Sequence, residues 1–173
     1  MEDKNGTNSV TSKVEGRDLI FERIFDAPRE LVFKVFSEAK HLEKWWGPKG
    51  WQTEIREFNF KPGGVWHFCT KCTDENQEMY GYESWGKAIF HEIAEPERII
   101  YTDVFSDEAG NQADGMPEQL VTITFTEHEG KTKLTSRTQF SSVEELQSVL
   151  DMGVVEGLTS TWDCLDEHLQ EIG

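Results

Sequence analysis

The sequence predicts an α+β protein in which a curved antiparallel sheet of about six to seven strands wraps around one long C-terminal helix. Two observations predict this fold. Residues 142–172 carry apolar side chains at three- and four-residue steps, which is the period of an amphipathic helix. Between residues 51 and 140, short β-prone runs alternate with turns. Consecutive strands joined by short turns form a meander, and a sheet of that size twists and curls.

The N-terminal quarter predicts a tail, a strand and two short helices. Residues 1–16 are polar and predict a disordered tail, which leaves residues 17–173 as a single domain. A mostly apolar run predicts the first strand over residues 18–25. Pro28 suits the first position of a helix, and a second short helix is expected over residues 38–46.

The middle of the chain predicts the remaining strands. Lys61-Pro62-Gly63-Gly64 is a strong turn signal between two of them. Residues 106–118 form a polar loop, and the sequence leaves open whether this loop is a lid. Strands are predicted over residues 51–60, 65–70, 79–93, 98–105, 120–127 and 131–140.

The C-terminal stretch is expected as one long helix with at most one break. Ser141 or Ser142 offers a hydroxyl cap at its start. Gly153 and Gly157 lie near the apolar side, where each costs about 1 kcal/mol relative to Ala, so they serve close packing or leave room for another group. The apolar side consists of Leu146, Val149, Leu150, Val154, Leu158, Trp162, Leu165 and Leu169.

Composition excludes several classes of partner. The chain has 17 Lys and Arg against 33 Asp and Glu, a formal charge of −16, which argues against nucleic acid and anionic membrane surfaces. No apolar run is long enough to span a membrane, and the N-terminus has no apolar signal core. Three cysteines fit a reducing compartment. We therefore expect a cytoplasmic protein. The sequence does not set the oligomeric state, and we expect a monomer or weak dimer.

No catalytic or metal-binding constellation is evident. Cys69 and Cys72 form a single C-x-x-C, whereas a zinc site needs about four ligands, so we expect ordinary thiols, no metal and no cofactor. Strand alternation places His67 on the face opposite Trp66, facing solvent. His168 is expected on the polar, solvated side of the last helix.

Several motifs occur together, in a consistent order, over about residues 18–170. They are residues 25–33 (FDAPRELVF), 45–48 (WWGP), 61–66 (KPGGVW), 85–87 (WGK), 92–103 (EIAEPERIIYTD) and 152–157 (MGVVEG). With them the chain resembles the START-like (SRPBCC, helix-grip) superfamily, and within it the polyketide-cyclase-like family named for homologues of an activator of a heat-shock-protein ATPase. The resemblance implies an apolar cavity between the sheet and the C-terminal helix. Members include ligand carriers, cyclases and co-chaperone modules, so it predicts the place of the site and not its chemistry.

Aromatic residues are abundant, with six Trp, eleven Phe and three Tyr. Core packing explains any one of them, but as a group they are typical of a lined cavity with a few polar anchors. The candidate ligand-binding residues are Trp46, Trp66, Phe68, Trp85, Tyr101, Phe105, Met152 and Gly153.

Three functions remain open. The first is a module that binds a small hydrophobic or aromatic molecule in the cavity. The second is a cyclase- or hydrolase-type enzyme that uses the same cavity, which requires an inward His, Asp, Glu or Tyr. The third is a module that binds a chaperone, which requires an exposed apolar or charged patch. We rank them in that order.

Overall fold

The structure is a computed structural model that describes residues 10–112 and 118–173 of the chain. Within these ranges it contains eight strands and four helices, in an order that confirms the predicted α+β fold. The elements are β1 (Thr11–Glu15), β2 (Asp18–Phe25), α2 (Arg29–Ser37), α3 (Ala39–Trp45), β3 (Trp51–Phe58), β4 (Val65–Cys72), β5 (Glu83–Ala94), β6 (Arg98–Ser106), β7 (Glu118–His128), β8 (Lys131–Gln139), α4 (Val143–Asp151) and α5 (Val154–Ile172).

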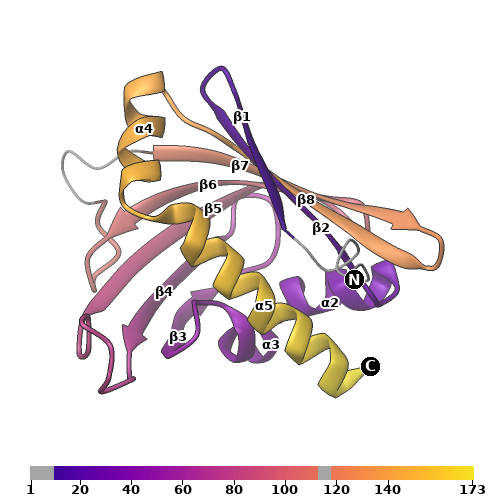
Figure 1. The fold of residues 1–173 in the computed structure, drawn as a ribbon, viewed down its shortest axis with the longest axis horizontal. Coiled ribbons are helices and arrows are strands. Elements are labelled where there is room, and N and C mark those ends of the chain that lie inside the picture. Colours follow the sequence, from indigo (N-terminus) through magenta and orange to yellow (C-terminus); the bar gives the residue numbers. More distant parts are fainter. Residues whose placement is uncertain (1–9, 113–117) are drawn as a thin grey trace.

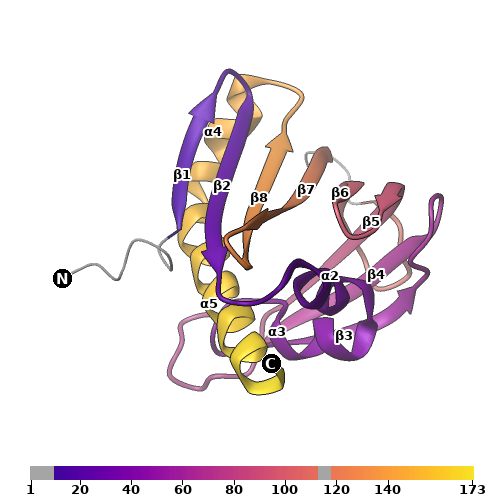
Figure 2. The same ribbon diagram turned by 90° about the vertical axis from the view of Figure 1, so that its right-hand side faces the viewer.

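The strands form one antiparallel sheet in the order β1-β2-β8-β7-β6-β5-β4-β3. The meander from β3 to β8 returns the chain to β2, while α2 and α3 carry it from β2 to β3 at the other edge. The sheet bends around α5, which lies on its concave side (Figures 1 and 2). This is the helix-grip arrangement expected from the sequence.

The additional strand is β1, which corrects the N-terminal boundary. Residues 11–15 were expected in the tail, but they pair with β2 through a hairpin at Gly16. Gly16 adopts a φ of 60°, as the first central residue of a two-residue hairpin often does. All five residues of β1 are exposed, so this edge strand has no apolar face and leaves no hydrophobic pattern in the sequence. Residues 1–9 lie outside the described part of the chain.

Trp162 attaches α5 to the sheet. Its indole is 2% exposed and lies between Phe21 and Phe25 of β2, with ring centroids at 6.3 and 5.8 Å. On the same strand, the buried guanidinium of Arg23 donates to Asp163 of α5 at 2.8 Å. These contacts hold the helix over the β2 side of the sheet.

The C-terminal stretch is broken once, at Gly153. Ser142 caps α4 by accepting from the Glu145 N–H at 3.1 Å. Gly153 has a φ of 88°, a left-handed conformation that favours glycine, and it begins α5. The two helices therefore meet at an angle near the left of Figure 1. In the described residues, no helix has the length and apolar character needed to cross a membrane.

Candidate functional site

The register of the strands defines the concave face. Residues directly opposite one another in an antiparallel sheet share a face. One cross-strand row joins Trp66 on β4, Ala88 on β5, Asp103 on β6 and Gln119 on β7. The neighbouring row joins Phe68, Gly86 and Phe105. Since Trp66, Ala88 and Phe68 belong to the hydrophobic core, both rows face the interior.

Aromatic rings gather around Trp66. The ring centroids of Trp46 and Phe68 lie 4.7 Å from that of Trp66, and the ring of Tyr101 lies 6.2 Å away across β5. Trp66 is 3% exposed. These rings form a continuous wall on the part of the concave face that α5 does not contact through Trp162.

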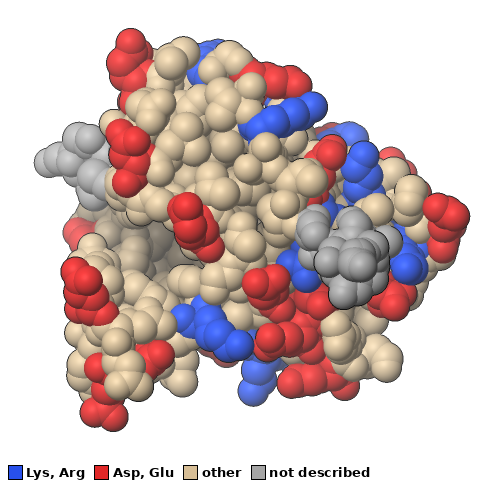
Figure 3. Space-filling model, viewed as in Figure 1, with Lys and Arg blue, Asp and Glu red and all other residues tan. Residues whose placement is uncertain are grey.

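Next to this wall the concave face is hollowed. A cavity of about 110 Å³ is lined by Phe68, Ser84, Trp85, Gly86, Asp103, Val104, Phe105 and Gln119. Figure 3 shows a hollow at the left of the molecule, below the region where α4 meets α5, with acidic side chains around it. The cavity is smaller than the ~300–1,000 Å³ of drug-sized sites, but it approaches the size of cavities that bind benzene.

Asp103 is the polar group that distinguishes this hollow. It is partly exposed, and burial raises the pKa of its carboxyl to about 7. No hydrogen bond joins it to any residue in the described ranges. The neighbouring phenol of Tyr101 is buried, and its pKa is raised by burial and by the charge of Asp103. A carboxyl that titrates near neutrality beside a cavity can bind a donor or move a proton.

Trp66 supplies an unsatisfied donor at the same wall. Its indole Nε1–H is buried and has no acceptor in the structure. In contrast, Trp45 donates to the Val35 carbonyl at 3.0 Å and Trp51 donates to Gln77 at 3.2 Å. Buried polar groups in native proteins are nearly always paired, so the Trp66 N–H is an exception for which residues 10–112 and 118–173 provide no acceptor.

Five of the eight predicted site residues share this concave region: Trp46, Trp66, Phe68, Tyr101 and Phe105. Trp85 does not. It pairs with Cys69, one position away from the Phe68–Gly86 row, so its side chain lies on the convex face. There it lies under the guanidinium of Arg56, whose Cζ is 4.8 Å from the ring centroid.

Met152 and Gly153 also lie differently from the expectation. Met152 is 66% exposed at the end of α4, and Gly153 supplies the positive φ at the helix break. Neither lines the hollow. The prediction placed both residues on the apolar side of one continuous helix. The chain breaks at Gly153 instead, so Met152 and Gly153 lie off the apolar sides of α4 and α5. Gly157 fits the expectation that a helix glycine leaves room for another group, since a Cβ at this position would have no other atom within 4 Å.

Two histidines are more buried than expected. His67 is on the predicted convex face, but it is 7% exposed because residues 106–112 cover it, and its Nε2 lies 3.1 Å from the Asp107 carbonyl oxygen. The described part of the 106–118 loop thus lies over the convex face, and residues 113–117 lie outside the described chain. His168 is 8% exposed, and its Nε2 lies 2.9 Å from Nδ1 of His41 on α3.

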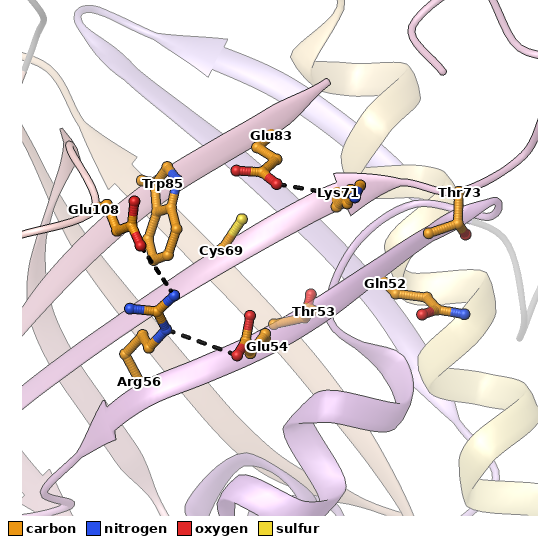
Figure 4. Close-up of a pocket in the computed structure, with 10 residues that line it drawn as sticks. All are labelled: Gln52, Thr53, Glu54, Arg56, Cys69, Lys71, Thr73, Glu83, Trp85 and Glu108. Carbon is orange, nitrogen blue, oxygen red and sulfur yellow. Dashed lines mark hydrogen bonds and ion pairs between the residues drawn. The ribbon is translucent and has the colours of Figure 1, made fainter. Parts of the chain in front are cut away.

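A second pocket occupies the convex face (Figure 4). Its volume is about 410 Å³, and it lies over β3, β4 and β5 beside Glu108. Its cations are already paired: Arg56 contacts Glu108 at 3.3 Å, and Lys71 lies 3.9 Å from Glu83. At its floor, burial raises the pKa of the Cys69 thiol, which makes this cysteine a poor nucleophile. In the described ranges, His, Cys, Asp and Glu side chains form no group of three that could hold a metal.

Sequence reasoning missed Asp103, Ser84 and Gln119. A signal for Asp103 was present, since Ile99, Tyr101 and Phe105 alternate on one face of the same strand. A carboxylate in the middle of such an apolar face is unusual for a merely structural position. Ser84 and Gln119 had no comparable signal, because each stands near a strand end where polar residues are common.

Together, the fold and the family features define a START-like, helix-grip protein whose curved sheet carries an aromatic-walled hollow bordered by the partly exposed carboxyl of Asp103. Residues 26–170 match the family described as Activator of Hsp90 ATPase homolog 1-like protein, AHSA1. This match spans most of the chain, and the chain belongs to that family. Among curated proteins, no significant match was found.

Solved structures share the whole fold. Protein Ms6760 from Mycobacterium smegmatis has a TM-score of 0.81 at 29% identity, with 92% of this chain and 94% of that chain covered. A protein from Arthrobacter aurescens has a TM-score of 0.84 at 27% identity, with coverage of 95% and 92%. CalU16 from Micromonospora echinospora has a TM-score of 0.59 at 14% identity, with coverage of 93% and 83%, which supports the fold alone.

Proposed function

We propose that this protein binds a small, largely apolar aromatic molecule in the hollow of the concave face. The observation that carries this proposal is the cavity beside the Trp66 wall, which is lined by Phe68 and Phe105 and is bordered by the partly exposed carboxyl of Asp103. Its size suits a molecule of about one ring. Apolar walls with few polar groups are typical of small-ligand sites.

Residues 119 and 120 offer a matched test. Gln119 lines the cavity, whereas Leu120 is the next residue along β7 and points to the opposite face. Gln119→Phe fills the hollow, and Leu120→Phe adds the same ring outside it. Saturation-transfer NMR with toluene is expected to detect binding to the wild type and to Leu120→Phe but not to Gln119→Phe. Equal signals from all three proteins would remove the hollow as the site.

Native mass spectrometry of freshly purified protein provides a second test. A bound small molecule that dissociates at modest collision energy is expected in the wild type and is reduced in Gln119→Phe. A molecule retained equally by both proteins would place the ligand elsewhere.

A cyclase- or hydrolase-type enzyme is the second candidate, and Asp103 is the observation that favours it. This hypothesis required an inward acid or base, and the carboxyl of Asp103 lines the cavity next to the phenol of Tyr101. With a pKa near 7, the carboxyl is suited to move a proton at neutral pH. Turnover that disappears in Asp103→Asn, while binding remains, would separate the enzyme from the carrier.

A chaperone-binding module is the third candidate. The family description points to it, and Met79, Tyr80 and Tyr82 expose apolar surface before β5. We propose that any such partner is basic, because the chain carries a net charge of −16 and would steer it. We propose that the protein acts in the cytoplasm, so the partner would be a cytoplasmic chaperone. If the purified protein does not alter the ATPase activity of such a chaperone, this candidate is removed.

A further inference from the structure

Three side chains that line the hollow can each accept a hydrogen bond. They are the carboxyl of Asp103, the hydroxyl of Ser84 and the amide of Gln119. All three lie on the concave face, because Gln119 is directly opposite Asp103 and Ser84 is two positions from Gly86 on β5. All three are also partly exposed, so a molecule that enters the hollow from solvent can reach them.

The carboxyl of Asp103 has no cation beside it in the described chain. None of the eight residues that line the hollow is Lys, Arg or His. Its cross-strand neighbours are Ala88 on β5 and Gln119 on β7, which carry no charge. The titratable group coupled to it is the phenol of Tyr101 on the same strand. The hollow therefore presents a negative charge that residues 10–112 and 118–173 leave uncompensated.

Asp18 shows how the same sheet treats another acid with little exposure. Its Oδ2 accepts from Nε of Arg137 at 2.7 Å on the convex side of β2. A carboxylate removed from water is costly unless a cation or hydrogen-bond donors accompany it. Asp103 differs from Asp18 in lacking such a partner, and it borders a cavity where a ligand can supply one.

Two aromatic rings complete the walls of the hollow. Phe68 and Phe105 lie on either side of Gly86 in one cross-strand row. The Phe68 ring covers Gly86 closely, because a Cβ at this glycine would come within 2.6 Å of the ring. Aromatic rings pack against the ring of a ligand and also attract cations to their faces.

A protonated amine is the simple group that fits these walls. An ammonium carries three donors and no acceptor, which matches a set of acceptors around one negative charge. A hydroxyl donates only once and gains nothing from the charge. A carboxylate or phosphate would be repelled by Asp103 and by the acidic side chains around the hollow (Figure 3).

We propose that the hollow selects protonated arylalkylamines of about one ring, with the ammonium against the carboxyl of Asp103 and the ring against Phe68 and Phe105. This inference rests on the proposed ligand-binding function and names the ligand class for that site.

Benzylammonium and benzyl alcohol test the inference, because they share a ring and a one-carbon arm and differ in the charged head group. At pH 8, benzylammonium is expected to bind the wild type about tenfold more tightly, since charged hydrogen bonds are stronger than neutral ones. Dissociation constants come from chemical-shift titrations of ¹⁵N-labelled protein. Benzylammonium is expected to compete with toluene, and Gln119→Phe is expected to bind neither.

The pH dependence provides a test that needs no variant. Burial raises the pKa of Asp103 to about 7, so the carboxyl is ionised at pH 8 and holds its proton at pH 5.5. Burial also raises the pKa of Tyr101, so the phenol stays neutral over this range. The preference for benzylammonium is therefore expected to disappear at pH 5.5, while the affinity for benzyl alcohol changes little.

Asp103→Asn is the matched variant, and Glu118→Gln is its control. Glu118 is exposed and precedes Gln119, so its side chain points to the opposite face of β7. Both substitutions remove one negative charge. Asp103→Asn is expected to keep toluene binding and lose the preference for benzylammonium at pH 8, whereas Glu118→Gln is expected to keep the preference.

The outcomes separate the two levels of the proposal. If toluene, benzyl alcohol and benzylammonium all fail to bind, the proposed function fails. If toluene binds but benzylammonium binds no more tightly than benzyl alcohol at pH 8, only the selection for amines fails. A preference that persists at pH 5.5 or in Asp103→Asn, or that is lost in Glu118→Gln, would assign it to the overall negative charge and overturn the inference.

Discussion

Trp66 and Asp103 stand two strands apart on one row of the concave face, and Ala88 alone separates them. Each presents a polar group that the described chain leaves without a hydrogen bond. A core optimised only for stability would not place an unpaired donor and an unpaired acid on one cross-strand row. Of the two residues, Asp103 borders the hollow, and its carboxyl leads to the first prediction.

Asp103→Asn is expected to stabilise the protein at high pH. Burial raises the folded-state pKa of Asp103 from 3.8 to about 7, so between these values the folded chain holds a proton that the unfolded chain releases. The contribution is therefore stabilising at low pH and is lost as the pH rises through about 7. At pH 8 the variant is expected to gain about 1–3 kcal/mol, measured by urea unfolding with tryptophan fluorescence. Identical pH dependence in both proteins would contradict the burial of this carboxyl.

The His41–His168 pair is expected to act in the opposite direction. Burial lowers the pKa of both imidazoles, although Glu38 opposes this at His41 and Glu171 opposes it at His168. The pair faces further charges: Lys34, Lys40 and Lys44. A depressed imidazole pKa gives stability that is present above 6.5 and is lost as the pH falls below it.

His168→Gln is therefore expected to flatten the loss of stability between pH 7 and pH 5.5. The measurement is made in the Asp103→Asn background, which removes the opposing titration. His128→Gln, at an exposed position of the β7–β8 hairpin, is the control and should leave the slope unchanged. An unchanged slope in His168→Gln would contradict the claim that burial of this pair makes stability depend on pH.

Gly153 and Gly157 are expected to respond oppositely to alanine. Gly153 has a φ of 88°, so Gly153→Ala is expected to cost about 1 kcal/mol. Gly157 lies within α5 with nothing near its Cβ position, so Gly157→Ala is expected to stabilise by up to about 1 kcal/mol. Thermal unfolding of both variants checks the sign. Destabilisation by Gly157→Ala would mean that close packing, not open space, surrounds this glycine.

Trp162→Ala is expected to be far more damaging than Trp85→Ala. Trp162 is 2% exposed between Phe21 and Phe25, and its truncation is expected to cost about 3–5 kcal/mol. Trp85 is partly exposed on the convex face, where it packs against Arg56, and its loss is expected to cost about 1 kcal/mol. Similar losses in chemical denaturation would contradict the assignment of the two faces.

Much of the fold could be predicted from the sequence because its elements have strong periodic patterns. The alternation of Trp66 and Phe68 with His67, and the three- and four-residue steps around Trp162, report burial directly. Strand β1 could not be predicted this way, because its five residues are all exposed and are held by backbone pairing.

The site was predictable only in part. Trp46, Trp66 and Phe68 meet as expected, since bulky aromatic residues on concave strands have few other places to pack. The face of Trp85 depended on the register between β4 and β5, which no local pattern reveals. Helical periodicity predicts a solvated His168, but α3 packs against that side of α5 and buries the imidazole against His41. Tertiary contacts of this kind override local patterns.

The central claim is that the working part of the molecule is the concave hollow beside Trp66. The most direct measurement is a toluene titration of ¹⁵N-labelled protein, followed through the indole N–H signals. We predict saturable shifts for Trp66 and for its neighbour Trp46, none for Trp85 on the convex face, and no shifts in Gln119→Phe. Unchanged Trp66 and Trp46 signals, or a saturable response of Trp85 alone, would contradict the account.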